Sequence, residues 1–203
     1  MTEAGWALVV PLKRLERAKT RLAVAGARRA RLALAMGSDT VAAALSVGAV
    51  GGLLVVTDDP AVEARALALG AAVLASGGGL NEALAQGALE AGRRWPGLRV
   101  AALAADLPSL RPGELAAALA EAEAAGRSCV GDSARFGTTL LAAAPGGALD
   151  PAFGEASFAR HVAGGATPLT GGWPGLRLDV DTADDLAAAV RLGVGPHTAE
   201  ALA

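Results

Sequence analysis

Apolar and polar positions alternate along this chain in blocks that predict strands separated by helices. Short apolar runs predict strands at residues 7–11, 53–56, 71–74, 99–104, 128–130, 138–142 and 176–178. Longer segments with helical spacing of apolar residues predict helices at 27–45, 60–69, 80–94 and 112–125, then a short helix after Gly154 and another opened by Thr182. Strands separated by helices of this length are typical of βαβ units. The pattern predicts an α/β fold with a mostly parallel sheet, in a single domain of residues 1–203.

Capping residues support two of these helix starts. Asp59 precedes Pro60, which is the combination of an N-cap side chain and proline at the first helical position. Thr182 is followed by Asp184 and Asp185, and the first turn of a helix favours negative charge.

Composition narrows the class of protein. A hydrophobic fraction of 53% and a mean hydropathy of +0.41 exclude an intrinsically disordered chain. The longest uncharged stretch, residues 40–57, is interrupted by a serine and three glycines and is not expected to span a membrane. The single cysteine, Cys129, excludes an internal disulfide and a cysteine-rich zinc site. No basic segment precedes the first apolar run, so no signal peptide is expected and the predicted location is the cytoplasm.

The net charge of −2 conceals a basic segment near the start of the chain. An overall charge this close to zero argues against a general nucleic-acid or membrane-surface binder. Eight of the 18 basic residues nevertheless lie before residue 32, including the only two lysines, Lys13 and Lys19. Lysine supplies a mobile point charge suited to phosphate. The alternative is that this segment is simply a solvated basic face.

Two aspartates follow predicted strands and are expected to converge. Ligands of parallel α/β sheets bind beyond the carboxyl ends of the strands, where Asp106 and Asp179 are placed by this pattern. Two carboxylates opposite a loop that carries lysines predict a Mg²⁺–nucleotide site. Asp181 is a further metal candidate and an equally good candidate for helping to start the last helix.

The absence of two glycine-rich motifs disfavours some classes of nucleotide-binding protein, and the remaining motifs are weak signals by themselves. No G-x-G-x-x-G or Walker P-loop follows the first strand, which disfavours dinucleotide dehydrogenases and P-loop NTPases. Residues 137–139 and 153–157 could present N–H and hydroxyl donors to an anion, although simple turns have the same appearance. His161 and His197 lack the spacing of a metal-binding pair, and Cys129 is expected in the core.

A set of short segments, in order along the chain, resembles one family of nucleotidyltransferases. They are Pro11-Leu12-Lys13, Ala18-Lys19-Thr20-Arg21-Leu22, Leu80-Asn81-Glu82-Ala83-Leu84, Asp106-Leu107-Pro108, Asp132 through Thr138, Phe153-Gly154-x-x-Ser157 and Leu176-Arg177-x-Asp179-Val180-Asp181-Thr182. Together they resemble the guanylyltransferases of coenzyme F-420 biosynthesis, which comprise 2-phospholactate guanylyltransferases and their bacterial phosphoenolpyruvate guanylyltransferase relatives. Residues 173–177 and 192–196 look like the bacterial branch in particular.

The resemblance implies a fold and a set of site residues. The implied fold is a Rossmann-like nucleotidyltransferase fold, a three-layer sandwich as in molybdenum-cofactor guanylyltransferases. The implied catalytic residues are Lys13, Lys19 and Arg21, and the implied Mg²⁺ ligands are Asp106 and Asp179. Phosphoenolpyruvate is implied to bind at Thr138, Gly154 and Ser157. The implied nucleotide contacts are Lys13, Lys19, Thr57, Asn81 and Asp106.

The activity implied by the resemblance is transfer of GMP from GTP to phosphoenolpyruvate, which gives enolpyruvyl-diphospho-guanosine and pyrophosphate. Acceptors such as 2-phospho-L-lactate or 3-phosphoglycerate, and a molybdopterin-type nucleotidyltransferase, remain alternatives. A nucleotide-binding module without catalysis is the non-enzymatic alternative. The expected partners are GTP and the phospho-acid, without nucleic acid or membrane, and a homodimer is left open.

Overall fold

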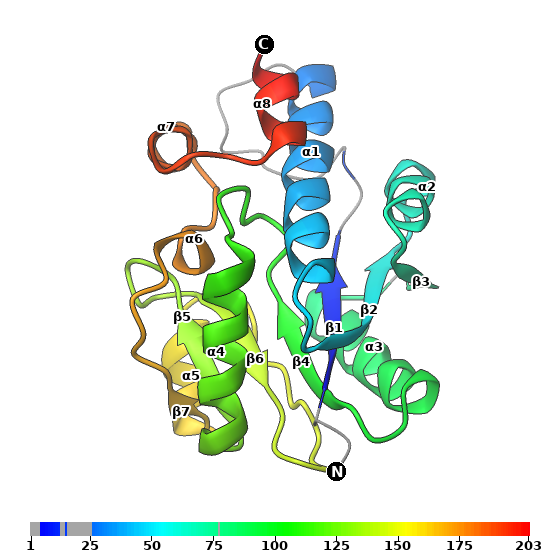
Figure 1. Cartoon of the computed structure of the whole chain (residues 1–203), viewed down its shortest axis with the longest axis vertical. Helices are drawn as coiled ribbons and strands as arrows, with labels where there is room; N and C mark the ends of the chain where they lie inside the picture. Colours follow the sequence, from blue (N-terminus) through cyan, green and yellow to red (C-terminus); the bar gives the residue numbers. More distant parts are fainter. Residues whose placement is uncertain (1–4, 13–14, 16–25, 77) are drawn as a thin grey trace.

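The computed structural model describes residues 5–12, 15, 26–76 and 78–203. Strands and helices alternate over most of this range (Figure 1). The strands are β1 (Trp6–Pro11), β2 (Val50–Thr57), β3 (Ala72–Ala75), β4 (Arg99–Leu103), β5 (Ser128–Gly131), β6 (Thr138–Ala142) and β7 (Thr167–Pro168). The helices are α1 (Gly26–Leu45), α2 (Pro60–Ala68), α3 (Leu80–Arg94), α4 (Pro112–Ala125), α5 (Ser157–Ala163), α6 (Pro174–Arg177), α7 (Ala183–Leu192) and α8 (Pro196–Leu202).

The seven strands form one sheet in the order β3-β2-β1-β4-β6-β5-β7. Strands β1 to β4 are parallel, as are β5 and β7, whereas β6 runs antiparallel to both of its neighbours. The prediction of a mostly parallel sheet is therefore confirmed. Because β6 runs the other way, its first residue, Thr138, lies at the edge where the parallel strands end.

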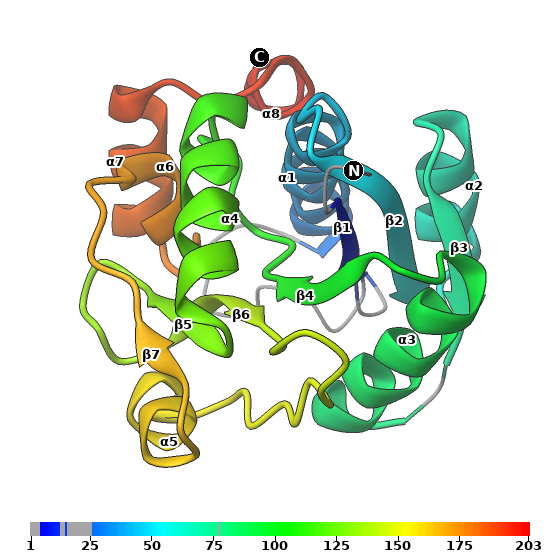
Figure 2. The same cartoon turned by 60° about the horizontal axis from the view of Figure 1, so that its bottom comes forward.

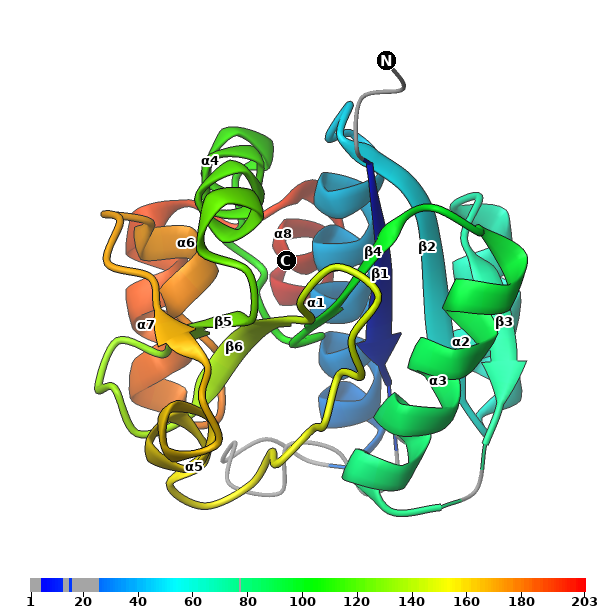
Figure 3. The same cartoon turned by 90° about the horizontal axis from the view of Figure 1, so that it is seen from below.

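Helices cover both faces of this sheet (Figures 2 and 3). Trp6, Leu8 and Val10 of β1 pack in a core with α1, α2 and α4, whereas Ala7 and Val9 face the opposite core with α3. This alternation follows from the period-two geometry of a strand. The result is the three-layer sandwich implied by the resemblance.

Close contact between α3 and the sheet depends on a glycine. A Cβ atom built on Gly87 would lie 2.6 Å from Val9 Cγ1 and 2.8 Å from Val56 Cγ2. These separations are too short for carbon atoms, so a larger residue here would push α3 away from β1 and β2. Leu84 of the same helix lines the cavity described below, so this close packing helps to set one of its walls.

The prediction of a strand at 176–178 is wrong, because the first two of these residues end helix α6 and the third is its C-cap. Pro174 occupies the first helical turn, where its missing N–H costs nothing. Glu114 of α4 accepts hydrogen bonds from the next two amides, those of Gly175 at 3.3 Å and Leu176 at 3.0 Å. The short strand β7 and helix α8 were not predicted.

The predicted helix starts at Asp59 and Thr182 are confirmed. The Asp59 side chain accepts from the N–H groups of Ala61 and Val62, and Thr182 forms a capping box with Asp185. Among the described helices, none combines the length and apolar character needed to cross a bilayer.

Candidate nucleotidyl-transfer site

A cavity of about 720 Å³ opens at the carboxyl edge of the parallel strands. Its lining includes the end of β1, the segment after β4 and the start of β6. Strands β2 and β3 extend the sheet on one side of β1, and β4 lies on the other side. The cavity therefore lies at the point where the strand order changes direction, which is the usual ligand site of such sheets.

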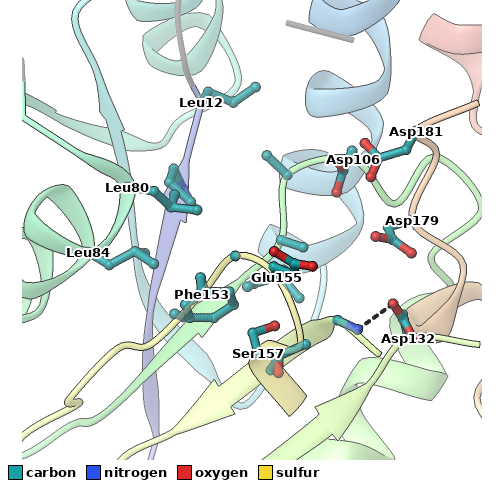
Figure 4. A pocket seen from close by; sticks show the side chains of 18 of the residues that line it. Leu12, Leu80, Leu84, Asp106, Asp132, Phe153, Glu155, Ser157, Asp179 and Asp181 are labelled. Carbon is teal, nitrogen blue, oxygen red and sulfur yellow. Dashed lines mark hydrogen bonds between the residues drawn. The ribbon is translucent and has the colours of Figure 1, made fainter. Parts of the chain in front are cut away.

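Four carboxylates gather on one side of this cavity: Asp106, Asp132, Asp179 and Asp181 (Figure 4). The turn that carries Asp106 is fixed by Thr40 of α1. The Thr40 hydroxyl accepts from the Leu107 N–H at 3.0 Å and shares its own proton between the carbonyl oxygens of Met36, at 3.0 Å, and Ala105, at 3.1 Å. A buried hydroxyl thus holds the backbone on both sides of Asp106.

Asp179 reaches the same place without following a strand. The N–H of Val180 donates to the carbonyl oxygen of Asp106 at 3.1 Å, and the Val180 side chain is fully buried beside α1 and α7. Arg177 anchors the preceding segment by donating to the carbonyl oxygens of Gly131, Leu169 and Gly171 at 2.8 to 3.2 Å. The expected convergence with Asp106 is present, although a backbone bond and an arginine produce it.

This acidic group perturbs the ionisation of Asp179. Burial, followed by the charges of Asp106, Asp132 and Asp181, raises the pKa of Asp179 to about 7. A divalent cation would relieve that repulsion. Among the described residues no group of three or more His, Cys, Asp or Glu is arranged to hold a metal ion. Carboxylate oxygens suit a hard divalent cation, and such a cation is commonly bound by one or two carboxylates together with substrate phosphates and water.

The Asp181 side chain lines the cavity, and the capping of α7 is performed by Thr182 and Asp185. Asp181 contributes only its N–H to that cap, which donates to Asp185 at 3.2 Å. Its carboxylate thus faces the cavity and is not part of the capping box.

The lining of the same cavity contains Thr138, Gly154 and Ser157, the three residues predicted for the acceptor. Asp132 shapes the loop before Thr138, because its carboxylate accepts from the Phe136 N–H at 2.9 Å and the Gly137 N–H at 2.6 Å. A dashed line in Figure 4 marks a hydrogen bond to Asp132. Sequence analysis did not single out this role for Asp132.

The loop before α5 has an unusual backbone. Gly154 has φ +116° and Ala156 has φ +50°, so both adopt positive φ values just before Ser157. Glycine tolerates such values, whereas alanine is strained by them. The loop turns sharply at this point and places Ser157, which is buried, at the start of α5.

His161 is the residue that sequence analysis missed. Its ring is 1% exposed, with Nδ1 2.9 Å from Thr138 Oγ1 and Nε2 accepting from the Ala152 N–H at 2.9 Å. Burial, then the charges of Arg127 and Arg160, lowers its pKa to about 4, so the ring is neutral. The available signal was its spacing of four from Ser157, which places both side chains on one face of a helix.

The remaining predicted site residues either do not line the cavity or lie outside the described residues. The Asn81 side chain bonds both backbone groups of Phe153, accepting from its N–H at 2.7 Å and donating to its carbonyl at 3.1 Å. Thr57 ends β2, where its hydroxyl accepts from the Asp59 N–H at 3.1 Å. Neither Thr57 nor Asn81 is among the residues that line the cavity. Their contacts with the nucleotide therefore stay predictions. Lys13, Lys19 and Arg21 lie outside the described residues.

The pattern of the family described as "Guanylyl transferase CofC like" matches residues 6–203. The chain belongs to this guanylyl transferase family. It is 57% identical to the phosphoenolpyruvate guanylyltransferase of Geodermatophilus obscurus, over 98% of this chain and 94% of that protein. It is 55% identical to the phosphoenolpyruvate guanylyltransferase of Streptomyces avermitilis, with the same coverage of 98% and 94%.

Solved structures share the fold at low identity. A nucleotidyl transferase from Methanothermobacter superposes with a TM-score of 0.61 at 19% identity, covering 94% of this chain and 98% of that one. Rv0371c of Mycobacterium tuberculosis, solved in complex with manganese, gives a TM-score of 0.57 at 19% identity, covering 94% and 100%. The predicted Rossmann-like nucleotidyltransferase fold is confirmed.

Proposed function

We propose that this guanylyl transferase family member transfers GMP from GTP to phosphoenolpyruvate and releases pyrophosphate. One observation carries the proposal: a single cavity is lined both by Asp106 and Asp179 and by Thr138 and Ser157. Carboxylates suit a cation that neutralises triphosphate, and hydroxyl donors suit a second anion. The names of the close relatives support the choice of phosphoenolpyruvate.

In the proposed reaction, a phosphate oxygen of phosphoenolpyruvate attacks the α-phosphorus of GTP in line. The new P–O bond forms as the bond from the α-phosphorus to the bridging oxygen breaks, and the electron pair leaves with pyrophosphate. The attacking phosphate is already anionic at neutral pH, so the protein needs neither a covalent nucleophile nor a general base. Its contribution is to orient two anions that repel each other.

Asp106 and Asp179 would hold Mg²⁺, which when bound supplies positive charge to the phosphates. Lys13, Lys19 and Arg21 are the proposed phosphate contacts. Thr57 and Asn81 are placed by the proposal on the nucleoside side, with Asn81 also holding the backbone of the acceptor loop at Phe153. We propose the cytoplasm as the location of the reaction.

On the acceptor side, Thr138, Gly154 and Ser157 would contact the three-carbon acid. Removal of one donor, by Thr138→Val or Ser157→Ala, should raise the KM for the acceptor by roughly tenfold, because one hydrogen bond to a charged group is lost. The KM for GTP should stay within about twofold. An effect confined to GTP would contradict this assignment.

The experiment that tests the function is a pyrophosphate-release assay with GTP and Mg²⁺. Phosphoenolpyruvate, 2-phospho-L-lactate and 3-phosphoglycerate are supplied side by side, and the highest kcat/KM is expected for phosphoenolpyruvate. A higher value for either other acid would assign that acid as the acceptor. GTP binding without pyrophosphate release from any of them would favour a molybdopterin-type acceptor or a silent nucleotide-binding module.

A further inference from the structure

His161 joins the two segments that form the acceptor side of the cavity. Its Nδ1 contacts Thr138 at the start of β6, and its Nε2 contacts the Ala152 N–H just before the loop of Phe153 and Gly154. The Phe153 ring packs edge-on against the imidazole, with centroids 4.9 Å apart and an interplanar angle of 69°. A single buried side chain therefore links one predicted acceptor contact to the loop that carries the other two.

The hydrogen bonds of this ring determine its tautomer. A backbone N–H can only donate, so the Ala152 N–H requires a lone pair on His161 Nε2. The ring is neutral and carries one proton, which must then be on Nδ1. It follows that Nδ1–H donates to Thr138 Oγ1, which accepts.

This bond constrains the direction of the Thr138 hydroxyl. Its oxygen accepts from His161, so its own proton has to be donated to another group. Among the described residues, Thr138 Oγ1 has no other hydrogen-bond partner, and Thr138 lines the cavity. The proton is therefore available to a ligand.

We propose that His161 is a positioning residue that makes Thr138 an obligate hydrogen-bond donor toward an anionic oxygen of the acceptor. The inference rests on the proposed function, and it deepens that function by requiring a carboxylate or phosphate oxygen at this point of the acceptor. A neutral acceptor group that can only donate would leave the Thr138 proton without a partner, because the bond from His161 prevents that proton from being donated to the ring.

Two substitutions separate positioning of the hydroxyl from support of the loop. In His161→Asn the side-chain amide nitrogen takes the place of Nδ1 and can still donate to Thr138. In His161→Gln the amide oxygen reaches the place of Nε2 and can accept from Ala152, while the donor to Thr138 is lost. His197→Gln is the matched control, because His197 contacts Arg65 on a different part of the molecule.

The expected result is a KM for phosphoenolpyruvate raised about tenfold in His161→Gln and about twofold in His161→Asn. The KM for GTP should stay within about twofold in all variants, and His197→Gln should resemble the parent. In a Thr138→Val background, His161→Gln should raise the acceptor KM no further, because its effect passes through that hydroxyl. Equal effects of Asn and Gln, or multiplied effects in the double variant, would overturn the proposal.

A second measurement decides the tautomer without any turnover. The chain has two histidines, so His197→Gln assigns their ring ¹⁵N signals by NMR. The proton is expected on Nδ1 of His161, and a proton on Nε2 would overturn the proposal even if the enzyme is active. If the parent protein releases no pyrophosphate with any acceptor, the proposed function fails. The His161 proposal is then tested by the dissociation constant for phosphoenolpyruvate, with a loss of affinity of about tenfold expected in His161→Gln.

Discussion

Acidification should remove stability that the buried, neutral His161 contributes. Its pKa is lowered from 6.5 to about 4 in the folded protein, first by burial and then by Arg127 and Arg160. Between those values the unfolded chain binds a proton that the folded chain does not. The contribution is therefore fully present above about pH 6.5 and is lost as the pH falls toward 4.

The size of the loss follows from the two pKa values, 6.5 and about 4. At about pH 5.5 the linkage relation gives a loss of about 1.3 kcal/mol relative to about pH 7.5, and at about pH 4.5 it gives about 2.5 kcal/mol. The ring is 1% exposed, so solvent screening reduces these values little. His161→Gln has no titrating group here and should not show this loss.

The assay is urea unfolding of the parent and His161→Gln across this pH range, with the same slope m required for both proteins. The stability advantage of the parent over His161→Gln should shrink by about 1.3 kcal/mol between about pH 7.5 and pH 5.5. An advantage that stays constant within about 0.3 kcal/mol would refute the reasoning, because the ring would then titrate alike in the folded and unfolded chains.

Three further substitutions test other parts of the site. The raised pKa of Asp179 means that its ionised form destabilises the metal-free protein, so Asp179→Asn should be about 1–4 kcal/mol more stable than the parent near pH 8; the upper value is the full linkage effect of the shift and the lower value allows for solvent screening. Added Mg²⁺ should stabilise only the parent in thermal melts, and a less stable variant would contradict this reasoning. Arg177→Met removes the donors to three backbone carbonyl oxygens. The free energy of unfolding, measured by urea denaturation, should fall by about 2–4 kcal/mol. A loss below about 0.5 kcal/mol would contradict the anchoring role of this arginine. Ala156→Gly relieves the strain of a positive φ of +50° and should raise the free energy of unfolding by about 0.5–1 kcal/mol in the same assay. A less stable variant would show that packing of the alanine methyl group outweighs the strain.

Much of the fold follows from local pattern. Helix α3 was predicted at 80–94, where the structure has Leu80–Arg94, because its apolar spacing is regular and its packing face continuous. The segment 176–178 was mistaken for a strand because so short an apolar run has no period of its own. Its helical form depends on Glu114, which lies more than sixty positions earlier in the chain.

Only part of the site was predicted, because some of its contacts also depend on residues that are distant in the chain. Asp106 and Asp179 were correctly placed together, yet the bond that joins them runs from Val180 to a carbonyl oxygen that sequence cannot locate. His161 lacks the spacing of a metal-binding pair, and its role is not visible in the sequence because its partners, Thr138 and Ala152, become neighbours only when β6 and the loop before α5 fold together. The contacts predicted for Lys13, Lys19 and Arg21 stay predictions.

The central claim is that Asp106 and Asp179 hold the cation and the triphosphate in a transfer site. It is tested most directly by the rate of pyrophosphate release from GTP, Mg²⁺ and phosphoenolpyruvate in Asp106→Asn. The matched control is Asp184→Asn, an exposed carboxylate in the first turn of α7. The account predicts release in the parent and the control, and loss of at least about a hundredfold in Asp106→Asn with its fold unchanged. Release from Asp106→Asn at the rate of the parent would contradict it.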